Sequence, residues 1–212
     1  MTDACCELGA KLLDRNQVLY ETENFFVAPS IGQIDRPGYL LILTKSCLRG
    51  IGSISEDWYS ELEDLQKRVR AKVKEKYGVS PMIFEHGPRI GEYRGGGCLD
   101  HAHLHVVPGV DLLPDIGADL MSRLENPGLF HRVDRVDSYK RAKEILHKEQ
   151  SSYFVAESPD ERRMIVEVNF KIPSQHLRRL IGKQRKTEKW DWALFPQHEL
   201  VQQTIDDLQG KF

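Results

Sequence analysis

The sequence has little net charge and no long hydrophobic run. Its 212 residues include 30 basic and 32 acidic side chains, a formal net charge of −2. This balance excludes the strongly cationic surface that non-specific binding to nucleic acid requires. The longest uninterrupted apolar run, Tyr39 to Leu43, is far shorter than the roughly 20 residues of a membrane-spanning helix. We therefore expect a soluble protein that neither crosses a membrane nor makes extended contact with nucleic acid.

Cysteine is scarce, and the N-terminus lacks a targeting signal. The four cysteines, at positions 5, 6, 47 and 98, form no Cys-x-x-Cys pair and are too few for a disulfide framework. They indicate reduced thiols. The segment from Met1 to Glu7 has no basic stretch followed by an apolar one. We expect a cytoplasmic protein.

The first half of the chain alternates strand and helix signals. Residues 23–28 and 39–45 predict a hairpin, and residues 80–85 and 98–107 predict two more strands. Apolar residues at steps of three and four predict a long helix from Ser53 or Ser55 to Tyr77. Ser53 and Glu56 have the spacing of a capping box, and Gly78 is the expected C-cap.

The second half has a different pattern. It predicts helices at 117–124, 138–147, 175–181 and 196–208, with a strand pair at 153–157 and 164–170. Its basic segment contains Arg178, Arg179, Lys183, Arg185 and Lys186, which we expect on a solvated surface. The length corresponds to about 1.4 domains of roughly 150 residues. We expect a catalytic unit at 1–110 and a C-terminal extension at 111–212 that packs on the same domain.

Three of the eight histidines alternate in one string, His101-Ala102-His103-Leu104-His105. In a strand, alternate side chains point to the same face, about 6.6 to 7 Å apart. The pattern therefore places three imidazoles on one face and Ala102, Leu104 and Val106 toward the core. Three rings over that length can line one small-ligand site.

Two chemistries use such a cluster. Paired histidines on a strand can bind zinc, with Glu85 or His86 completing the site. Alternatively, a neutral imidazole is a good nucleophile at phosphorus because its pKa lies near 6.5. Gly95, Gly96 and Gly97 favour the second chemistry, because glycine lets backbone N–H groups approach an anion closely.

The string His101 to Val107 resembles the motif of the histidine triad (HIT) superfamily of nucleotide hydrolases and transferases. Residues 37–43, Pro-Gly-Tyr-Leu-Leu-Ile-Leu, are similar to the Pro-Gly-His strand of that family, which precedes its long helix and a strand leading into a glycine-rich loop. The resemblance covers residues 20 to 109. It implies an α+β fold, a HIT-like antiparallel sheet packed by the helix at 55–77, with a C-terminal helix and hairpin extension.

The resemblance also implies a mechanism and its residues. His103 would attack the α-phosphorus of a nucleotide and form a nucleotidyl-histidine intermediate. His101 would orient it, and His105 would contact phosphate and leaving-group oxygens. Histidine rather than glutamine at 105 is similar to the hydrolase branches, so we expect water as the acceptor. No cofactor is required for this chemistry, although a divalent metal is compatible with it.

Further residues are expected at the phosphates. Gly96, Gly97 and Cys98 would approach them, with a thiol at 98 where relatives carry a hydroxyl, and Ser30 would reach a ribose hydroxyl. Glu85 stands where relatives place an amide, and a carboxylate there would repel a phosphate. We therefore expect Glu85 to meet a basic or hydroxyl-bearing leaving group, or a metal ion.

The leading hypothesis is a hydrolase that cleaves a nucleoside phosphoester, phosphoanhydride or phosphoramidate. The alternatives are a nucleotidyltransferase or phosphorylase with the same intermediate, a non-catalytic nucleotide- or RNA-binding module, and a zinc enzyme. The expected partner is a nucleotide substrate. Family members commonly form dimers through a continuous sheet, so a homodimer is a further expectation, unless the extension supplies that half of the sheet.

Overall fold

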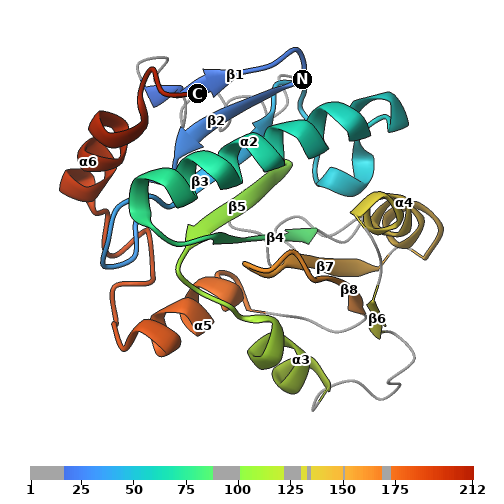
Figure 1. The fold of residues 1–212 in the computed structure, drawn as a ribbon. Coiled ribbons are helices and arrows are strands. Elements are labelled where there is room, and N and C mark those ends of the chain that lie inside the picture. Colours follow the sequence, from blue (N-terminus) through green and yellow to red (C-terminus); the bar gives the residue numbers. More distant parts are fainter. Residues whose placement is uncertain (1–16, 88–100, 122–129, 133–134, 150, 169–172) are drawn as a thin grey trace, which may run out of the picture.

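The described strands of the computed structural model form one antiparallel sheet in the order β1-β2-β3-β5-β4-β7-β8-β6. The structure describes residues 17–87, 101–121, 130–132, 135–149, 151–168 and 173–212. The strands are β1 (Tyr20–Glu21), β2 (Phe25–Pro29), β3 (Leu40–Thr44), β4 (Pro81–Gly87), β5 (His103–Pro108), β6 (Phe130–Arg132), β7 (Ser152–Glu157) and β8 (Arg163–Val168). The predicted α+β class is confirmed (Figure 1).

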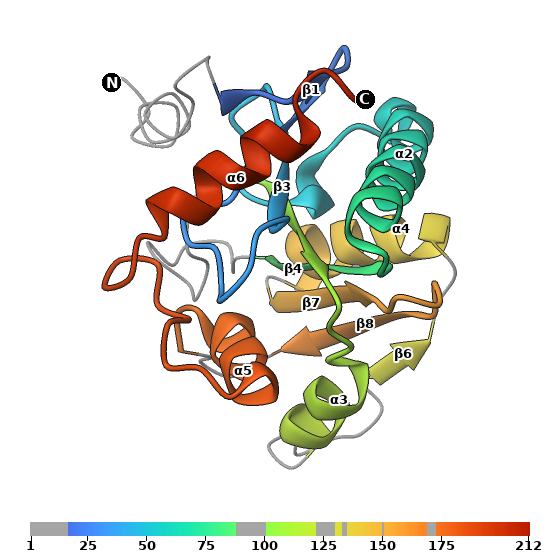
Figure 2. The same cartoon turned by 60° about the vertical axis from the view of Figure 1, so that its left-hand side comes forward.

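The helices lie on both faces of this sheet. They are α2 (Tyr59–Tyr77), α3 (Leu113–Met121), α4 (Arg135–Glu144) with a π-helical turn at Ile145–Glu149, α5 (His176–Arg185) and α6 (His198–Leu208). Helix α2 lies across the strands (Figure 1), and α3 and α5 lie on the other side of the sheet (Figure 2). None of the helices in the described ranges is both long and apolar enough to cross a membrane.

Helix α2 ends where the sequence predicts but begins later. Gly78 terminates it in the left-handed conformation, φ 72°, which glycine adopts without a steric penalty. The predicted capping box is wrong, because Ser53 ends a 3-10 turn at Ile51–Ser53 and a second 3-10 turn, Glu56–Trp58, leads into the helix. The first of these turns lies against β4, where the amide of Ile51 donates to the buried carboxylate of Glu85.

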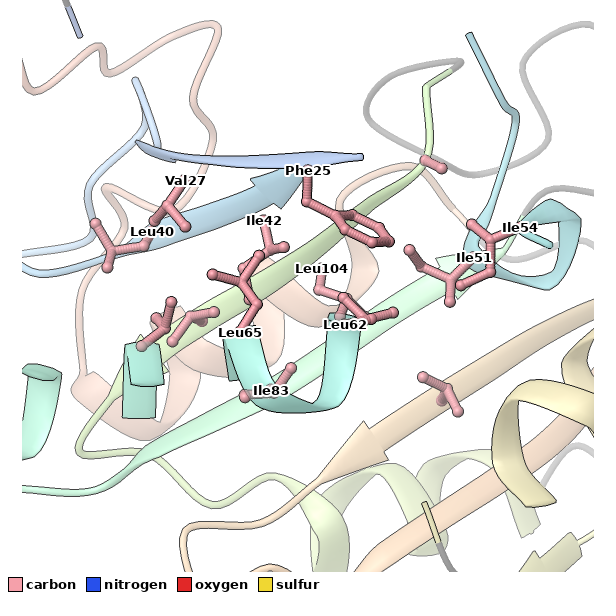
Figure 3. Packing of buried hydrophobic residues seen from close by; sticks show 14 of the residues in the cluster. Phe25, Val27, Leu40, Ile42, Ile51, Ile54, Leu62, Leu65, Ile83 and Leu104 are labelled. Carbon is pink, nitrogen blue, oxygen red and sulfur yellow. The ribbon is translucent and has the colours of Figure 1, made fainter. Parts of the chain in front are cut away.

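Two hydrophobic clusters lie on the two faces of the sheet. The α2 cluster combines α2 residues such as Leu62 and Leu65 with Ile42, Ile83 and Leu104 of the strands (Figure 3). It also contains Val201, Ile205 and Leu208 of α6 and Tyr153 and Val155 of β7. The α5 cluster, on the other face, contains Phe84, Phe154, Leu177 and Ile181. Residues before and after position 110 therefore share both cores.

The strands of the extension continue the sheet of the first half. Strand β7 pairs with β4 from Ile83↔Glu157 to Gly87↔Tyr153, and β8 then pairs with β7. The predicted hairpin at 153–170 thus occupies the edge of β4. The extension supplies the second half of a continuous sheet within the same chain.

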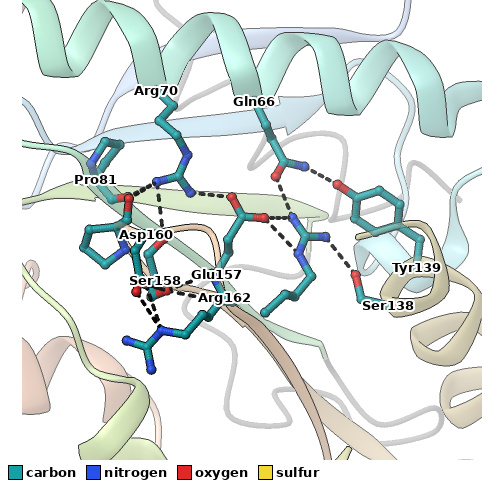
Figure 4. A network of polar contacts seen from close by, with 11 residues as sticks. Gln66, Arg70, Pro81, Ser138, Tyr139, Glu157, Ser158, Asp160 and Arg162 are labelled. Atoms are coloured by element: carbon teal, nitrogen blue, oxygen red, sulfur yellow. Dashed lines mark hydrogen bonds and ion pairs between the residues drawn. The ribbon is translucent and has the colours of Figure 1, made fainter. Parts of the chain in front are cut away.

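A buried ion-pair network fastens this junction. Glu157 of β7 pairs with Arg70 of α2 and with Arg163 of β8, and all three side chains are at most 8% exposed (Figure 4). Arg70 also donates to the Pro81 carbonyl, and Arg163 donates to Ser138 and Gln66. A single buried carboxylate thereby joins α2, β7 and β8.

The basic segment is only in part the solvated surface that the sequence predicts: Arg179, Lys183 and Lys186 are exposed, but Arg178 and Arg185 are not. Arg178 is 3% exposed, and its guanidinium donates to the carbonyls of Trp190 and Gly32. Arg185 donates to the carbonyls of Ile34 and Pro108. The prediction failed for these two arginines because three of the four acceptors, on Gly32, Ile34 and Pro108, lie far away in the sequence and meet the arginines only in the folded chain.

Candidate active site

Strand β5 runs through the middle of the sheet and carries His103 and His105, and His101 lies two residues before it. The strand lies between β3 and β4, with Leu43 opposite His103 and Phe84 opposite His105. Ala102, Leu104 and Val106 belong to the α2 cluster, so His103 and His105 of β5 share the opposite face. The predicted alternation is confirmed, and all three imidazoles are buried.

Backbone carbonyls fix the orientation of two of these rings. Because a carbonyl oxygen can only accept a hydrogen bond, His101 Nε2 donates to Thr44 O at 2.7 Å and His103 Nδ1 donates to His101 O at 2.6 Å. His103 Nε2 faces His105 Nε2 at 3.1 Å. When His103 is neutral, its proton is on Nδ1 and Nε2 carries a lone pair.

Burial keeps His103 and His105 neutral. It lowers the pKa of His103 to about 4, with the positive field of His101 as a smaller cause. Burial also lowers the pKa of His105 well below its usual value, reinforced by the charges of His103, Arg178 and His86. At neutral pH the centre of the site is therefore an uncharged imidazole with an available Nε2 lone pair.

Aromatic and polar side chains of neighbouring strands surround the triad. Phe84 of β4 stacks on His105, with ring centroids 4.8 Å apart. Also on β4, His86 stacks on Phe154 of β7 at 4.2 Å, and its Nε2 lies 3.0 Å from Ser152 Oγ. Phe154 and Ser152 of the extension therefore contact His86 beside the triad. The sequence did not predict this contact, because His86 has no regular spacing to the other histidines. Alternation along β4 could have placed His86 near the triad, because His86 lies two residues after Phe84 and so points to the same face.

Glu85 faces the opposite side of the sheet. Its carboxylate accepts hydrogen bonds from the Ile51 amide at 3.0 Å and from the Tyr153 hydroxyl at 2.6 Å, and both of these residues belong to the α2 cluster. Burial raises the pKa of Glu85 to about 7, opposed by hydrogen bonds from Tyr153 and from the backbone of Ile51 and His103. The structure does not bring Glu85 together with the triad imidazoles. The expectation that it meets a leaving group or metal there is corrected.

The other predicted phosphate-binding residues have different outcomes. Gly96, Gly97 and Cys98 lie outside the described residues. Ser30 is buried in the loop after β2, where its amide donates to Tyr39 O at 2.9 Å.

The expectation of reduced thiols is corrected at Cys47, which is disulfide-bonded.

The triad does not present three nitrogens to one metal ion. His101 Nε2 is directed at the Thr44 carbonyl, whereas His103 Nε2 and His105 Nε2 face each other. Within the described ranges, no group of three or more His, Cys, Asp or Glu side chains is placed to hold a metal. The ring orientations suit a nucleophile and its hydrogen-bonding neighbours better than a three-histidine metal site.

Comparison with known proteins finds similarity at the level of solved structures. No protein-family model and no curated protein matches the chain. A HIT family hydrolase from Clostridium thermocellum is 24% identical, with 53% of this chain and 96% of that chain covered and a TM-score of 0.37. A DUF4931 family protein from Bacillus cereus is 14% identical, with 73% and 85% covered and a TM-score of 0.49. A Zn-bound histidine triad family protein from Mycobacterium smegmatis is 19% identical, with 70% and 96% covered and a TM-score of 0.38.

The chain's own motif and architecture carry more weight than these distant similarities. The described elements follow the order that the resemblance implies, with strand β3, long helix α2, strand β4 and then the triad strand β5. His103 and His105 alternate on the central strand β5, between β3 and β4. The order of the described elements thus agrees with the order expected from the motif.

Proposed function

We propose that the chain is a nucleotidyl hydrolase that acts through a covalent intermediate on His103. The observation that carries the proposal is the 2.6 Å hydrogen bond from His103 Nδ1 to the His101 carbonyl. It leaves Nε2 as the lone-pair nitrogen of an imidazole that burial keeps neutral. A neutral imidazole with a fixed lone pair is the form that attacks phosphorus.

The proposed reaction has two displacements at the same phosphorus. In the first, the His103 Nε2 lone pair forms a bond to the α-phosphorus and the bond to the leaving-group oxygen or nitrogen breaks. His105 Nε2, 3.1 Å from His103 Nε2, is positioned to donate a hydrogen bond to a phosphoryl or leaving-group atom. In the second, water forms a P–O bond and releases one proton to the solvent, the P–N bond breaks with its electron pair returning to His103 Nε2, and the nucleoside monophosphate leaves with His103 neutral again.

Mass spectrometry of the intact protein tests the covalent step. We expect a nucleotidyl adduct when the chain is mixed with a dinucleoside polyphosphate or a nucleoside phosphoramidate and quenched in neutral denaturant. His103→Ala removes the adduct, whereas His198→Ala, at an exposed position of α6, retains it. Nucleotide binding without adduct or turnover in the unmodified chain would instead identify a non-catalytic binding module.

The product identifies the acceptor. With water as acceptor, the product is a nucleoside monophosphate even in excess inorganic phosphate. A nucleoside diphosphate formed only when phosphate is present would identify a phosphorylase with the same intermediate. Dialysis against a chelator is expected to leave turnover unchanged, because every step is assigned to side chains of the chain itself. Loss of turnover that zinc restores would overturn this assignment.

A further inference from the structure

Tyr39 lies between the triad and the C-terminal extension. It directly precedes β3, is 1% exposed, and its hydroxyl lies 2.9 Å from His105 Nδ1. The rings of Tyr39 and His105 meet edge to face at 5.7 Å. The Arg178 guanidinium of α5 lies over the Tyr39 ring, 5.1 Å from its centroid.

The direction of the bond between Tyr39 and His105 follows from counting protons. His103 donates from Nδ1 to a carbonyl, so the neutral ring has no proton on Nε2. His105 Nε2 lies 3.1 Å from that lone pair, a distance that is favourable only if His105 carries its proton on Nε2. A neutral His105 with a proton on Nε2 has a lone pair on Nδ1. The Tyr39 hydroxyl must therefore donate to it.

The reverse arrangement is unfavourable. If His105 donated from Nδ1 to Tyr39, its Nε2 would carry a lone pair directed at the lone pair of His103 Nε2. Such a contact between two buried acceptors would leave both without a donor, which costs free energy. The Tyr39 hydroxyl can rotate to donate, so it selects one tautomer of His105.

We propose that Tyr39 is a positioning residue that holds His105 in the tautomer with the proton on Nε2, and that Arg178 of the extension holds Tyr39 in place. The tautomer assignment depends only on the geometry of the free protein. The catalytic consequence rests on the proposed function, in which His105 Nε2 donates to the reacting phosphoryl group. In the other tautomer, His105 Nε2 would carry a lone pair instead of a proton. That lone pair would repel the negative charge that develops on the phosphoryl oxygens, which a hydrogen bond would stabilise.

Hydrogen bonds to two backbone carbonyls hold the Arg178 guanidinium in this position. Its Nε donates to Trp190 O at 2.9 Å and its Nη2 donates to Gly32 O at 2.5 Å. Gly32 makes room for it, since a Cβ at this position would run into both Trp192 and the Arg178 guanidinium. A cation over an aromatic face is attracted to the ring electrons. It also draws electron density from the phenol, which makes the hydroxyl a better donor.

The backbone of Tyr39 is fixed from two further sides. Gln33 accepts from Tyr39 N at 2.9 Å and donates to Tyr39 O at 2.8 Å. Thr204 of α6 accepts from the neighbouring Gly38 N at 2.9 Å. Two helices of the extension, α5 and α6, thus restrain the residue that contacts His105.

The tautomer is measured directly by long-range proton–nitrogen correlation NMR on histidine-labelled full-length protein. We expect His105 of the unmodified chain to show a protonated Nε2 and an unprotonated, hydrogen-bonded Nδ1. In Tyr39→Phe, which removes only the hydroxyl, we expect the protonated-Nε2 population to fall. The matched control is Tyr59→Phe, which removes a buried hydroxyl that has no hydrogen-bond partner in the described part of the chain and is expected to leave the His105 signals unchanged.

Kinetics then test the consequence. In Tyr39→Phe we expect kcat on a dinucleoside polyphosphate to fall on the order of 10- to 100-fold, by analogy with the loss of a hydrogen-bond partner that fixes the tautomer of a metal-bound histidine, with KM changed much less. In Arg178→Met we expect a smaller fall, roughly 3- to 10-fold, since a partly desolvated cation–π contact is weaker. Tyr59→Phe should match the unmodified chain.

The outcomes separate this proposal from the proposed function. A protonated Nδ1 on His105 in the unmodified chain, or an unaltered tautomer in Tyr39→Phe, overturns the role of Tyr39 whatever the activity. The expected tautomers without any nucleotidyl adduct would support the positioning of His105 and refute the hydrolase. A changed tautomer with kcat unchanged would refute the catalytic consequence.

Discussion

Two buried titratable side chains, on the neighbouring strands β4 and β5, point to opposite faces of the sheet. His103 faces the candidate site, and burial lowers its pKa to about 4. Glu85 lies on the other face, where burial raises its pKa to about 7 although it accepts hydrogen bonds. Both shifts have the same cause, because a group removed from water favours its neutral form. Each shift has a different consequence for the dependence on pH.

The first consequence concerns activity. An imidazole with a pKa of about 4 stays unprotonated in mildly acidic solution, so we expect kcat/KM on a dinucleoside polyphosphate to show no loss from His103 protonation between pH 6.5 and about pH 5. Single-turnover rates of adduct formation from pH 4 to 8 measure this. The same series on Glu85→Gln separates any effect of that carboxyl group. A loss with a midpoint near pH 6.5 in both proteins would contradict the assignment of a buried neutral nucleophile.

The second consequence concerns stability. The stabilising contribution of Glu85 is present below its unfolded pKa of 4.5 and is lost as the pH rises through 7. That of His103 is present above 6.5 and is lost as the pH falls through 4. In Glu85→Gln the pH-dependent contribution of Glu85 is absent and that of His103 remains. We therefore expect its free energy of unfolding in urea to rise more steeply between pH 4.5 and 6.5, by at most about 1.4 kcal/mol per pH unit for one proton. Identical slopes in the two proteins would exclude a raised pKa for Glu85.

At the scale of elements, the junction of α2, β7 and β8 depends on one carboxylate. Glu157 is paired with Arg70 and Arg163, all of them buried. In Glu157→Gln, which keeps the volume, two guanidinium groups would stay buried without their counter-charge. We expect a loss of about 3–5 kcal/mol in the free energy of unfolding, measured by urea denaturation.

The control for this variant is an exposed ion pair on the same helix. Asp64 and Lys67 of α2 are 72% and 60% exposed, and exposed pairs contribute little to stability. Asp64→Asn should leave the midpoint of unfolding unchanged. If Glu157→Gln behaved in the same way, the junction would be held by its apolar contacts alone.

Most elements could be predicted from local patterns, and the failures share a cause. The apolar period of α2, the alternation of β5 and the turn at Gly78 are local, and each is confirmed. The start of α2 at Tyr59 and the short strand β6, of three residues, depend on contacts with distant segments. The same holds for the burial of Arg178. Local sequence contains no information about which carbonyls a distant arginine will meet.

The candidate site was predictable to the same extent. The shared face of His103 and His105 follows from alternation alone and is confirmed, whereas His101 lies two residues before the strand. The placement of Glu85 follows from the same rule applied to β4, once β4 is known to pair antiparallel with β5. That pairing, and the approach of Tyr39 to His105, are properties of the folded sheet.

At the scale of the whole molecule, the two halves share their hydrophobic cores. The α2 cluster contains strand residues from the first half together with Val201, Ile205 and Leu208 of α6. Trp58 packs against this cluster and Trp190 packs against the α5 cluster. The three tryptophans of the chain, at 58, 190 and 192, therefore report on both faces and on both halves.

We expect the two halves to unfold together. Fluorescence of Trp58→Phe reports the extension, and that of the double variant Trp190→Phe and Trp192→Phe reports the first half. In each variant, the urea midpoint measured by fluorescence should coincide with the midpoint measured by circular dichroism, as in a two-state transition. Separate midpoints for fluorescence and circular dichroism in either variant would show that 1–110 and 111–212 are independent folding units.

The pairing of β7 with β4 also bears on how many triads one continuous sheet contains. The sequence contains the His-x-His-x-His pattern once, and the strands that continue the sheet beyond β4 come from the same chain. The continuous sheet is thus asymmetric, with a triad in one half only. We expect calorimetric titration of His103→Ala with a nucleoside monophosphate to give a stoichiometry of one per chain and a hyperbolic saturation curve. Cooperative saturation would require communication between chains, for which this sheet provides no second triad.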